Sequence, residues 1–259
     1  MQIYVCVKHV PDTAANIKLV DAAGFDESIK FVINPYDEYG LAAALQLVAN
    51  DGKGEVVTVT VGKESAVTTI RSALAVGANR GILVKTDRQF IDSNITSRLL
   101  KAAIQQDGCP DLIFTGKQSV DSEGMQTHYR LAQAIGMPVV TDVVDLQLND
   151  GKVVVEREIG GGAREMLEME LPCIIGATKG LSEPRYPKLP DILKAKKKEI
   201  KQWDVETLVP DLPEAATSIQ SLESVSERTG AQMLNGDPKT AANELVTILK
   251  KEKLIGKGD

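Results

Sequence analysis

The chain has 259 residues, of which 43% are hydrophobic and 25% charged, and its formal net charge is −6. This composition is typical of a globular protein with room for one large α/β domain, and the acidic balance argues against a nucleic-acid partner. No apolar run reaches the roughly 18 residues needed to cross a bilayer, so we expect no membrane-embedded segment.

The beginning of the chain and its cysteines predict where the protein works. The first ten residues follow a strand pattern without a basic region or a cleavage site, so we expect no targeting peptide. Cys6, Cys109 and Cys173 are far apart and lack metal-ligand spacing, which indicates a reduced, cytoplasmic compartment. With only two histidines besides, we predict no metal site.

Strand-like and helix-like segments alternate over the first 140 residues. The predicted strands cover residues 3–10, 55–62, 81–86, 111–116 and 137–150. The predicted helices cover residues 37–51, 63–79, 92–108 and 125–135. Strands separated by helices of this length predict right-handed crossovers and a three-layer α/β fold with a mainly parallel, doubly wound, Rossmann-like sheet. Ligands of such sheets bind beyond the carboxyl ends of the strands.

The pattern changes after about residue 145. Antiparallel strands are predicted from there to about residue 178, with turns at residues 149–151 and 160–162 and a last buried strand from residue 173. Three prolines between residues 184 and 190 then precede a predicted basic helix that continues to residue 203. Residues 205–236 are polar with little periodicity, and an amphipathic helix is predicted at residues 239–255.

These segments predict two regions. An α/β nucleotide-binding domain covers residues 1–200, with the antiparallel addition at about 145–178 and a partner-recognition loop and helix at 183–200. A C-terminal arm and helix follow at residues 201–259, and we expect them to lie on another subunit because they have no core of their own.

The loop at residues 116–127, "GKQSVDSEGMQT", is the strongest candidate site. It lacks the glycines and the hydroxyl residue that a Walker A loop places around its lysine, and it is not a G-x-G-x-x-G loop. Its backbone donors and small hydroxyls end at a helix N-terminus, an arrangement that attracts phosphate. A solvated strand-to-helix loop is the alternative.

Two further loops lie at the same predicted edge. In "INPYDEYG" (residues 33–40), Asp37 is placed to cap the next helix. In "KHVPDT" (residues 8–13), His9 and Asp12 could form an acid–base pair, but surface charges are the better interpretation. No catalytic residue is predicted. The lysines of "LKAKKKEIK" form either a solvated face or a surface for an acidic protein.

Six segments in this order resemble the β subunit of electron transfer flavoproteins: "VKHVPD", "INPYDE", "IRSALAVGANRGI", "GKQSVD", "VEREIGGGAREMLEMELPCII" and "EPRYPKLPDILKAKKK". The resemblance covers residues 1–200 nearly continuously. It implies an adenine nucleotide alpha-hydrolase-like fold and an electron carrier in place of an enzyme. It also implies a heterodimer with an α subunit that holds most of a redox-active FAD, which passes electrons from an acyl-CoA or related dehydrogenase to a quinone-linked acceptor.

The resemblance further implies a structural AMP in this subunit and a partner-recognition segment. The residues matching the AMP site are Cys6, Asn34, Pro35, Tyr36, Asp37, Val61, Gly116, Lys117, Gln118, Ser119, Val120, Asp121, Ser122, Glu123, Gly124, Met125, Gln126 and Thr127. The residues matching the recognition segment are Pro184, Arg185, Tyr186, Leu189, Ile192, Lys194 and Lys197. Leu189 matches the hydrophobic anchor of that segment.

Some members of the family bind a second FAD where others bind AMP, and bifurcate electrons from NADH. The residues "VPDT" (10–13) resemble those members, whereas Ser122–Gly124 and the bulky pair His128 and Tyr129 depart from them. We therefore favour AMP. Two other functions stay open: a non-redox sensor of adenine nucleotides, and an enzyme acting on a nucleotide, which lacks a visible nucleophile.

Overall fold

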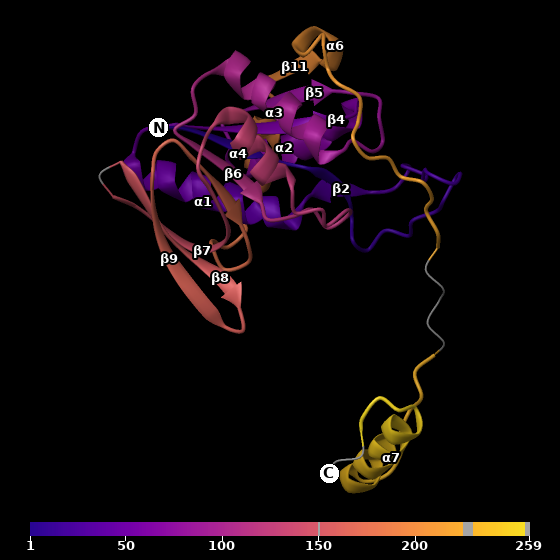
Figure 1. The fold of residues 1–259 in the computed structure, drawn as a ribbon. Coiled ribbons are helices and arrows are strands. Elements are labelled where there is room, and N and C mark those ends of the chain that lie inside the picture. Colours follow the sequence, from indigo (N-terminus) through magenta and orange to yellow (C-terminus); the bar gives the residue numbers. More distant parts are fainter. Residues whose placement is uncertain (150, 225–229, 257–259) are drawn as a thin grey trace. The chain divides into compact units, whose positions relative to one another are not determined.

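A computed structural model describes residues 1–149, 151–224 and 230–256 of the chain (Figure 1). Contacts group the chain into two compact units, Met1–Leu222 and Glu223–Asp259. The first unit therefore continues past residue 200, where the composition placed the start of an arm. The described helices are each too short or too polar to cross a membrane.

The first unit is built on a nine-stranded sheet with the order β11-β5-β4-β1-β6-β10-β7-β8-β9. Its strands are β1 (Gln2–Cys6), β4 (Glu55–Gly62), β5 (Arg80–Lys85), β6 (Leu112–Gly116), β7 (Val139–Asn149), β8 (Lys152–Gly160), β9 (Ala163–Glu170), β10 (Cys173–Ala177) and β11 (Ile200–Asp204). The strands from β11 to β7 pair in parallel, and β7, β8 and β9 pair antiparallel. The predicted mainly parallel sheet is confirmed, but the antiparallel addition ends at β9, because β10 pairs in parallel with β6 and β7.

Helices cover both faces of the parallel part. They are α1 (Pro35–Asp51), α2 (Val67–Val76) after a 3-10 turn at Glu64–Ala66, α3 (Ser93–Asp107) and α4 (Thr127–Ile135). One core cluster joins α1 and α2 to the sheet through Leu41, Ile70 and Leu74. The other joins α3 and α4 to the opposite face through Leu99 and Leu131. The predicted three-layer α/β architecture is therefore confirmed.

Helix boundaries follow from local chemistry. Pro35 occupies the first turn of α1, where a missing N–H costs nothing, and Gly52 ends the helix in the left-handed region with φ of 69°. Asp92 caps α3 by accepting a hydrogen bond of 2.7 Å from the Ile95 N–H. Met125 has a φ of 51°, so α4 begins at Thr127 and not at residue 125.

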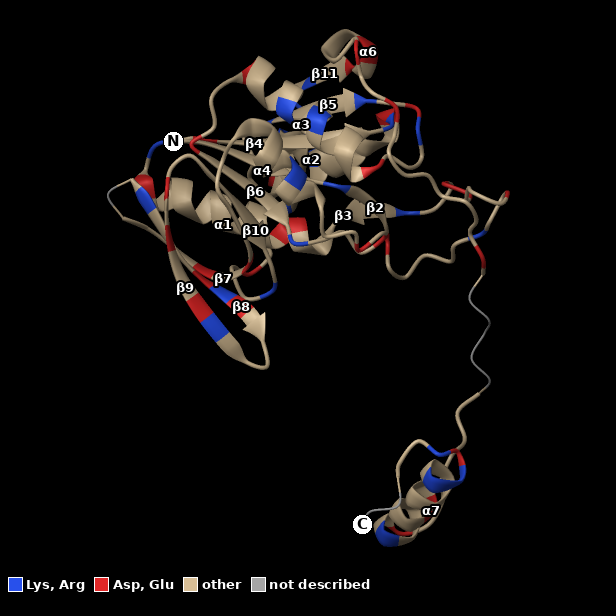
Figure 2. Cartoon of the chain, viewed as in Figure 1, with Lys and Arg blue, Asp and Glu red and all other residues tan. Residues whose placement is uncertain are grey.

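The antiparallel extension of β7, β8 and β9 carries charges of both signs on its outer strands (Figure 2). Cross-strand ion pairs join Lys152 to Glu168 at 2.6 Å and Arg157 to Glu165 at 2.8 Å. Val153, whose side chain lies on the opposite side of β8 from Lys152, is buried in the core. Charged side chains on an edge hairpin discourage pairing with other strands.

Three further predictions were wrong in detail. The strand predicted at residues 3–10 divides into β1 and β2 (His9–Pro11), which pairs with β3 (Phe31–Ile33) in a separate two-stranded sheet. The basic helix is only α5 (Leu189–Ala195), because the following residues find backbone partners on the free edge of β5 and form β11. Asn34, not Asp37, occupies the N-cap of α1, since the Asp37 carboxylate accepts hydrogen bonds from another loop.

After β11 the short helix α6 (Val205–Leu208) packs on α3. The second unit contains α7 (Pro238–Lys251), which Asp237 caps by accepting from the N–H groups of Lys239 and Thr240. None of the residues of α7 is buried, and Leu245 and Val246 are exposed. An amphipathic helix that leaves these apolar side chains exposed lacks part of the packing that normally stabilises it.

Candidate functional site

The carboxyl ends of β1 and β6 form the switch point of the sheet. From β1 the chain passes through α1 to β4 on one side, whereas α3 leads back from β5 to β6 on the other side of β1. Strand order therefore reverses between β1 and β6, which is where open α/β sheets bind their ligands. The predicted loops at residues 8–13, 33–40 and 116–127 all begin at or beside this edge.

Asp37 is the buried centre of the switch point. Its carboxylate accepts hydrogen bonds from the Lys8 N–H at 2.7 Å, the Gly116 N–H at 2.9 Å and Asn34 Nδ2 at 2.9 Å. Burial raises the pKa of Asp37 to about 7, although these three donors act in the opposite direction. One side chain thus ties the first turn of α1 to the strand ends of both β1 and β6.

Gly116 makes this approach possible. A Cβ atom at this position would overlap the Asp37 carboxylate and would lie 2.7 Å from Tyr36 Cβ. Only a residue without a side chain lets the first turn of α1 pack so close to the end of β6.

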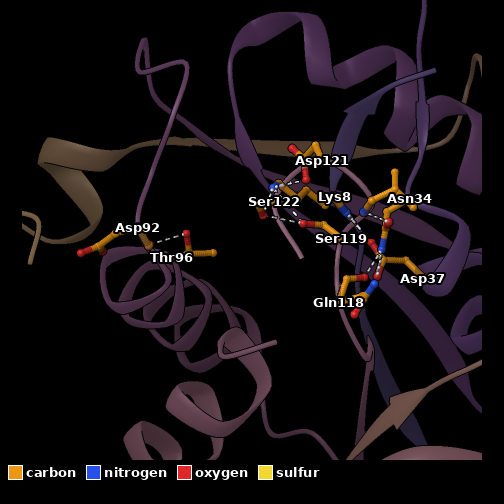
Figure 3. Close-up of polar contacts among 10 residues, drawn as sticks. Lys8, Asn34, Asp37, Asp92, Thr96, Gln118, Ser119, Asp121 and Ser122 are labelled. Carbon is orange, nitrogen blue, oxygen red and sulfur yellow. Dashed lines mark hydrogen bonds and ion pairs between the residues drawn. The ribbon is translucent and has the colours of Figure 1, made fainter. Parts of the chain in front are cut away.

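Lys8 gathers the candidate loop around its ammonium group (Figure 3). Lys8 Nζ lies 2.7 Å from Asp121 Oδ1, 3.2 Å from Ser119 Oγ and 3.4 Å from Ser122 Oγ. The two serine hydroxyls are 2.8 Å apart. Lys8 and Asp121 are both partly exposed, so their ion pair orients the loop more than it stabilises the fold.

Asn34 holds the backbone of the same loop. Its Nδ2 donates to the Gln118 carbonyl at 2.9 Å, and its Oδ1 accepts from the Val120 N–H at 3.1 Å. Asn34 is buried, so both ends of its amide are satisfied within the protein. The loop after β6 therefore takes its shape from the residue that begins α1.

Cys6 and Val61 stand at the ends of neighbouring strands. Cys6 is buried, and burial raises the pKa of its thiol, with the charge of Asp37 acting in the same direction. Cys6 is therefore a neutral, apolar part of the site wall and not a nucleophile. Val61 lies near the end of β4, the strand that pairs with β1.

The other predicted residues of the loop at 116–127 lie in two groups, one at its beginning and one at its end. Lys117 Nζ is 3.2 Å from Asp142 Oδ1 and 5.5 Å from the centre of the Tyr36 ring. Glu123, Gly124 and Met125 are exposed, and Gln126 Oε1 accepts a hydrogen bond from Ser93 Oγ at 3.1 Å. This last group extends the site toward α3 and not toward Asp37.

His128 and Tyr129 fill the first turn of α4. His128 is buried, its Nε2 has no hydrogen-bond partner among the described residues, and burial lowers its pKa to about 4. The Tyr129 hydroxyl is 2.9 Å from Thr141 Oγ1 on β7. The two rings lie edge to face, with centres 4.2 Å apart.

His9 and Asp12 do not form the acid–base pair considered from the sequence. His9 Nδ1 lies 2.6 Å from Thr69 Oγ1 and its ring stacks on Phe31, whereas Asp12 pairs with Lys30 at 2.8 Å. The interpretation as a loop with surface charges fits Asp12, whereas His9 lies in the strand β2 and is half-buried.

The predicted recognition segment is an exposed surface around α5. The exposed fractions of Tyr186, Leu189 and Ile192 are 90%, 71% and 42%. Arg185, Lys194 and Lys197 are also exposed, and Pro184 is half-buried. Apolar side chains that stand among cations in this way are typical of a docking surface.

Sequence reasoning missed Lys8 and Leu193. Lys8 follows β1 at the switch point, and its position directly after a buried strand was the available signal. Leu193 is 55% exposed and falls on the same face of α5 as Leu189, four residues earlier.

Comparison with known proteins decides the family. The family model described as "Electron transfer flavoprotein domain" matches residues 23–208. The chain is 32% identical to the electron transfer flavoprotein subunit beta of Bacillus subtilis, over 98% of this chain and 100% of that protein. It belongs to the electron transfer flavoprotein β-subunit family.

Two other relatives show the breadth of this family. The mitochondrial electron transfer flavoprotein subunit beta of Arabidopsis thaliana is 34% identical over 97% of this chain and 98% of its own length. The caffeyl-CoA reductase-Etf complex subunit CarD of Acetobacterium woodii is also 34% identical, over 98% and 100%. The resemblance seen in the sequence is thus confirmed, and the family implies an electron-transfer role beside an α subunit and FAD.

Proposed function

We propose that this chain is the β subunit of a heterodimeric electron transfer flavoprotein that binds AMP for structure. It helps an α subunit to hold the FAD that carries electrons from an acyl-CoA or similar dehydrogenase to a quinone-linked acceptor. The observation that carries this proposal is the convergence of Asn34, Asp37 and the loop at residues 116–122 at the switch point of the sheet.

The donors at this edge fit a nucleotide. The N-terminus of α4 leaves backbone N–H groups without helical partners, and such groups suit a phosphate. The loop contributes the hydroxyls of Ser119 and Ser122, and His128 Nε2 is a buried nitrogen with no hydrogen-bond partner in the part of the chain that the structure describes. Because Lys8 is paired with Asp121, its charge is already balanced, and the backbone becomes the main phosphate contact.

FAD, when bound in the heterodimer, supplies the ring that accepts and donates electrons. The residues of this chain then act by position. The Asp37 hydrogen bonds fix the strand ends, and buried Cys6 and Val59 exclude water from the sheet beneath the site. A β subunit of this kind needs no nucleophile or general base of its own.

The direct test is a count of ligands in the heterodimer. We expect the complex, co-expressed with its α subunit, to release one FAD and one AMP for each β chain on acid denaturation. Two FAD and no AMP would refute the AMP assignment. A colourless complex would refute the electron-carrier role and favour the nucleotide sensor.

An electron-bifurcating β subunit with a second FAD is the alternative function. It is supported by the residues "VPDT" at positions 10–13 and by the similarity to CarD. Against it stand the buried ring of His128 and the Tyr129 side chain at the start of α4. A second FAD would need to approach the backbone of this turn closely, and the two side chains add bulk there.

The exposed surface on α5 is the proposed contact with the dehydrogenase. Leu189 is the apolar anchor, and the surrounding lysines suit an acidic rim on the partner. We expect Leu189→Ala to weaken electron transfer from the dehydrogenase while the FAD content stays constant. Met166→Ala on β9, where the side chain is 68% exposed, is the matched control. Unaltered kinetics in Leu189→Ala would disprove the anchor role.

The exposed apolar residues of α7 give the C-terminal arm its proposed role. Leu245 and Val246 are exposed in the second unit, and we propose that the α subunit packs on them in the heterodimer. Removal of residues 238–259 is expected to lower the affinity between the subunits. An unchanged dissociation constant, measured by sedimentation, would count against this role.

A further inference from the structure

Helix α5 has very little hydrophobic packing of its own. Of its seven residues only Ala195 is buried, with an exposed fraction of 2%. Leu189, Ile192 and Leu193 all face solvent. A helix of two turns is marginal in water without tertiary contacts, so other interactions must hold α5 in place.

Arg71, on α2, supplies one such interaction. Its Nη1 donates to the Ala195 carbonyl at 2.7 Å and to the Lys198 carbonyl at 2.6 Å. These carbonyls lie at and just beyond the C-terminal end of α5, where the helix leaves acceptors unpaired and carries partial negative charge. Arg71 thus caps the C-terminal end of α5 from the neighbouring helix α2.

Lys198, which follows α5, donates in turn to carbonyls at the end of α2. Its Nζ donates to the carbonyls of Ala78 at 2.6 Å, Leu74 at 2.9 Å and Gly77 at 3.4 Å. These three carbonyls mark the C-terminal end of α2. Burial lowers the pKa of Lys198, as expected for an ammonium group turned into the protein.

The C-terminal end of α5 is therefore capped by a cation of α2, and that of α2 by a cation from the residues that follow α5. Within the described part of the chain, neither Arg71 nor Lys198 forms an ion pair with a carboxylate. Lys194, Lys196 and Lys197 belong to the same basic run and are all exposed. One lysine of the run is thus committed to the fold, and its neighbours stay available at the surface.

We propose that Arg71 and Lys198 form a reciprocal clamp that positions α5 and its exposed apolar face for docking. The clamp consists of these two side chains and the five carbonyls to which they donate. Neither side chain is required to contact the partner. The inference rests on the proposed docking function of α5. It adds two positioning residues, Arg71 and Lys198, that support this function without belonging to the docking surface.

The clamp makes a specific prediction about mobility. Loss of either cation removes its hydrogen bonds to carbonyls at a helix end, although the Ala195 carbonyl still accepts from the Lys198 N–H at 3.2 Å. The contact between α5 and α2 is then loosened, with Ala195 as the one buried residue of α5. Charge-assisted hydrogen bonds are roughly twice as strong as neutral ones, so their loss changes local opening by about an order of magnitude or more. The switch-point site lies at different elements and keeps all of its own contacts.

The test uses the complete heterodimer and the variants Lys198→Met and Arg71→Met, which keep most of the side-chain volume. Amide hydrogen exchange over residues 189–195 is expected to accelerate at least ~10-fold, with unchanged FAD and nucleotide content. Lys53→Met, a change in an exposed lysine between α1 and β4, is the matched control and leaves exchange unaltered. Lys198→Arg retains the donors and is expected to restore slow exchange.

Kinetics with the dehydrogenase provide the second readout. We expect the apparent KM for the heterodimer to rise roughly fivefold in both Met variants while kcat is retained, because only the docking geometry is loosened. Unchanged exchange in α5 would overturn the clamp, as would a loss of FAD that accompanies the faster exchange. If Leu189→Ala leaves KM unaltered, the docking role fails, and the exchange data still decide whether the clamp exists.

Discussion

The buried imidazole of His128 makes the stability of this chain depend on pH. Its folded-state pKa is about 4, against an ordinary value of 6.5, because burial disfavours the charged ring. Between these values the unfolded chain binds a proton that the folded chain refuses, so stability is lost as the pH falls from about 6.5 toward 4. From about pH 7.5 to about pH 4.5 the loss from this one group is about 2.5 kcal/mol.

The change His128→Phe keeps an aromatic ring and removes the titration. Urea unfolding of both chains at about pH 7.5 and about pH 4.5 measures the effect. On going to the lower pH, we expect the free energy of unfolding of the variant to rise relative to that of the original chain by about 2.5 kcal/mol. Comparing the two chains cancels the contributions of Asp37 and His9, whose pKa values are also shifted. Parallel pH profiles would show that His128 is not held neutral by burial.

Three further changes test the site and its support. Gly116→Ala forces a side chain against the Asp37 carboxylate and is expected to lower the free energy of unfolding by about 1–3 kcal/mol and to abolish AMP retention, as measured by denaturation and ligand release. Arg80→Met removes hydrogen bonds of 2.6 and 2.8 Å to Asp107 and of 2.9 and 3.0 Å to Glu55. Because Asp107 keeps Lys201 and the Tyr4 hydroxyl, each at 2.8 Å, we expect a loss of about 1–3 kcal/mol in urea unfolding. Asp121→Ala breaks a partly exposed ion pair, so we expect less than about 1 kcal/mol of change but weaker AMP retention by dialysis. Intact stability in either of the first two, or full retention in the third, would contradict the assigned role.

The fold could be predicted because its elements depend on local patterns. Apolar β-branched runs such as β4 and capped periodic segments such as α3 form wherever a neighbouring layer covers them. The strand β11 could not be predicted in this way. Its residues follow a basic helical pattern, and only the free edge of β5, far away in the sequence, provides the partners that extend them.

The site was predictable in its loops but not in its centre. Polar residues after strands mark the ligand edge of a parallel sheet, which brought Asn34 and the loop at residues 116–127 into consideration. The role of Asp37 depends on three donors from separate segments, and a sequence pattern shows only a helix cap at that position. Lys8 escaped notice for the same reason, because its partners lie more than a hundred residues away.

The clamp between α2 and α5 also has a consequence for the order of folding. Arg71 and Ala195 are 124 residues apart in the chain, so their contact closes a long loop, whereas the first strand–helix–strand units close short ones. We therefore expect α5 to become ordered only after β11 has joined the edge of a finished sheet. Pulsed hydrogen exchange during refolding would detect this late protection. A nascent or misassembled chain would then lack the proposed docking surface, and only a completed subunit would present it.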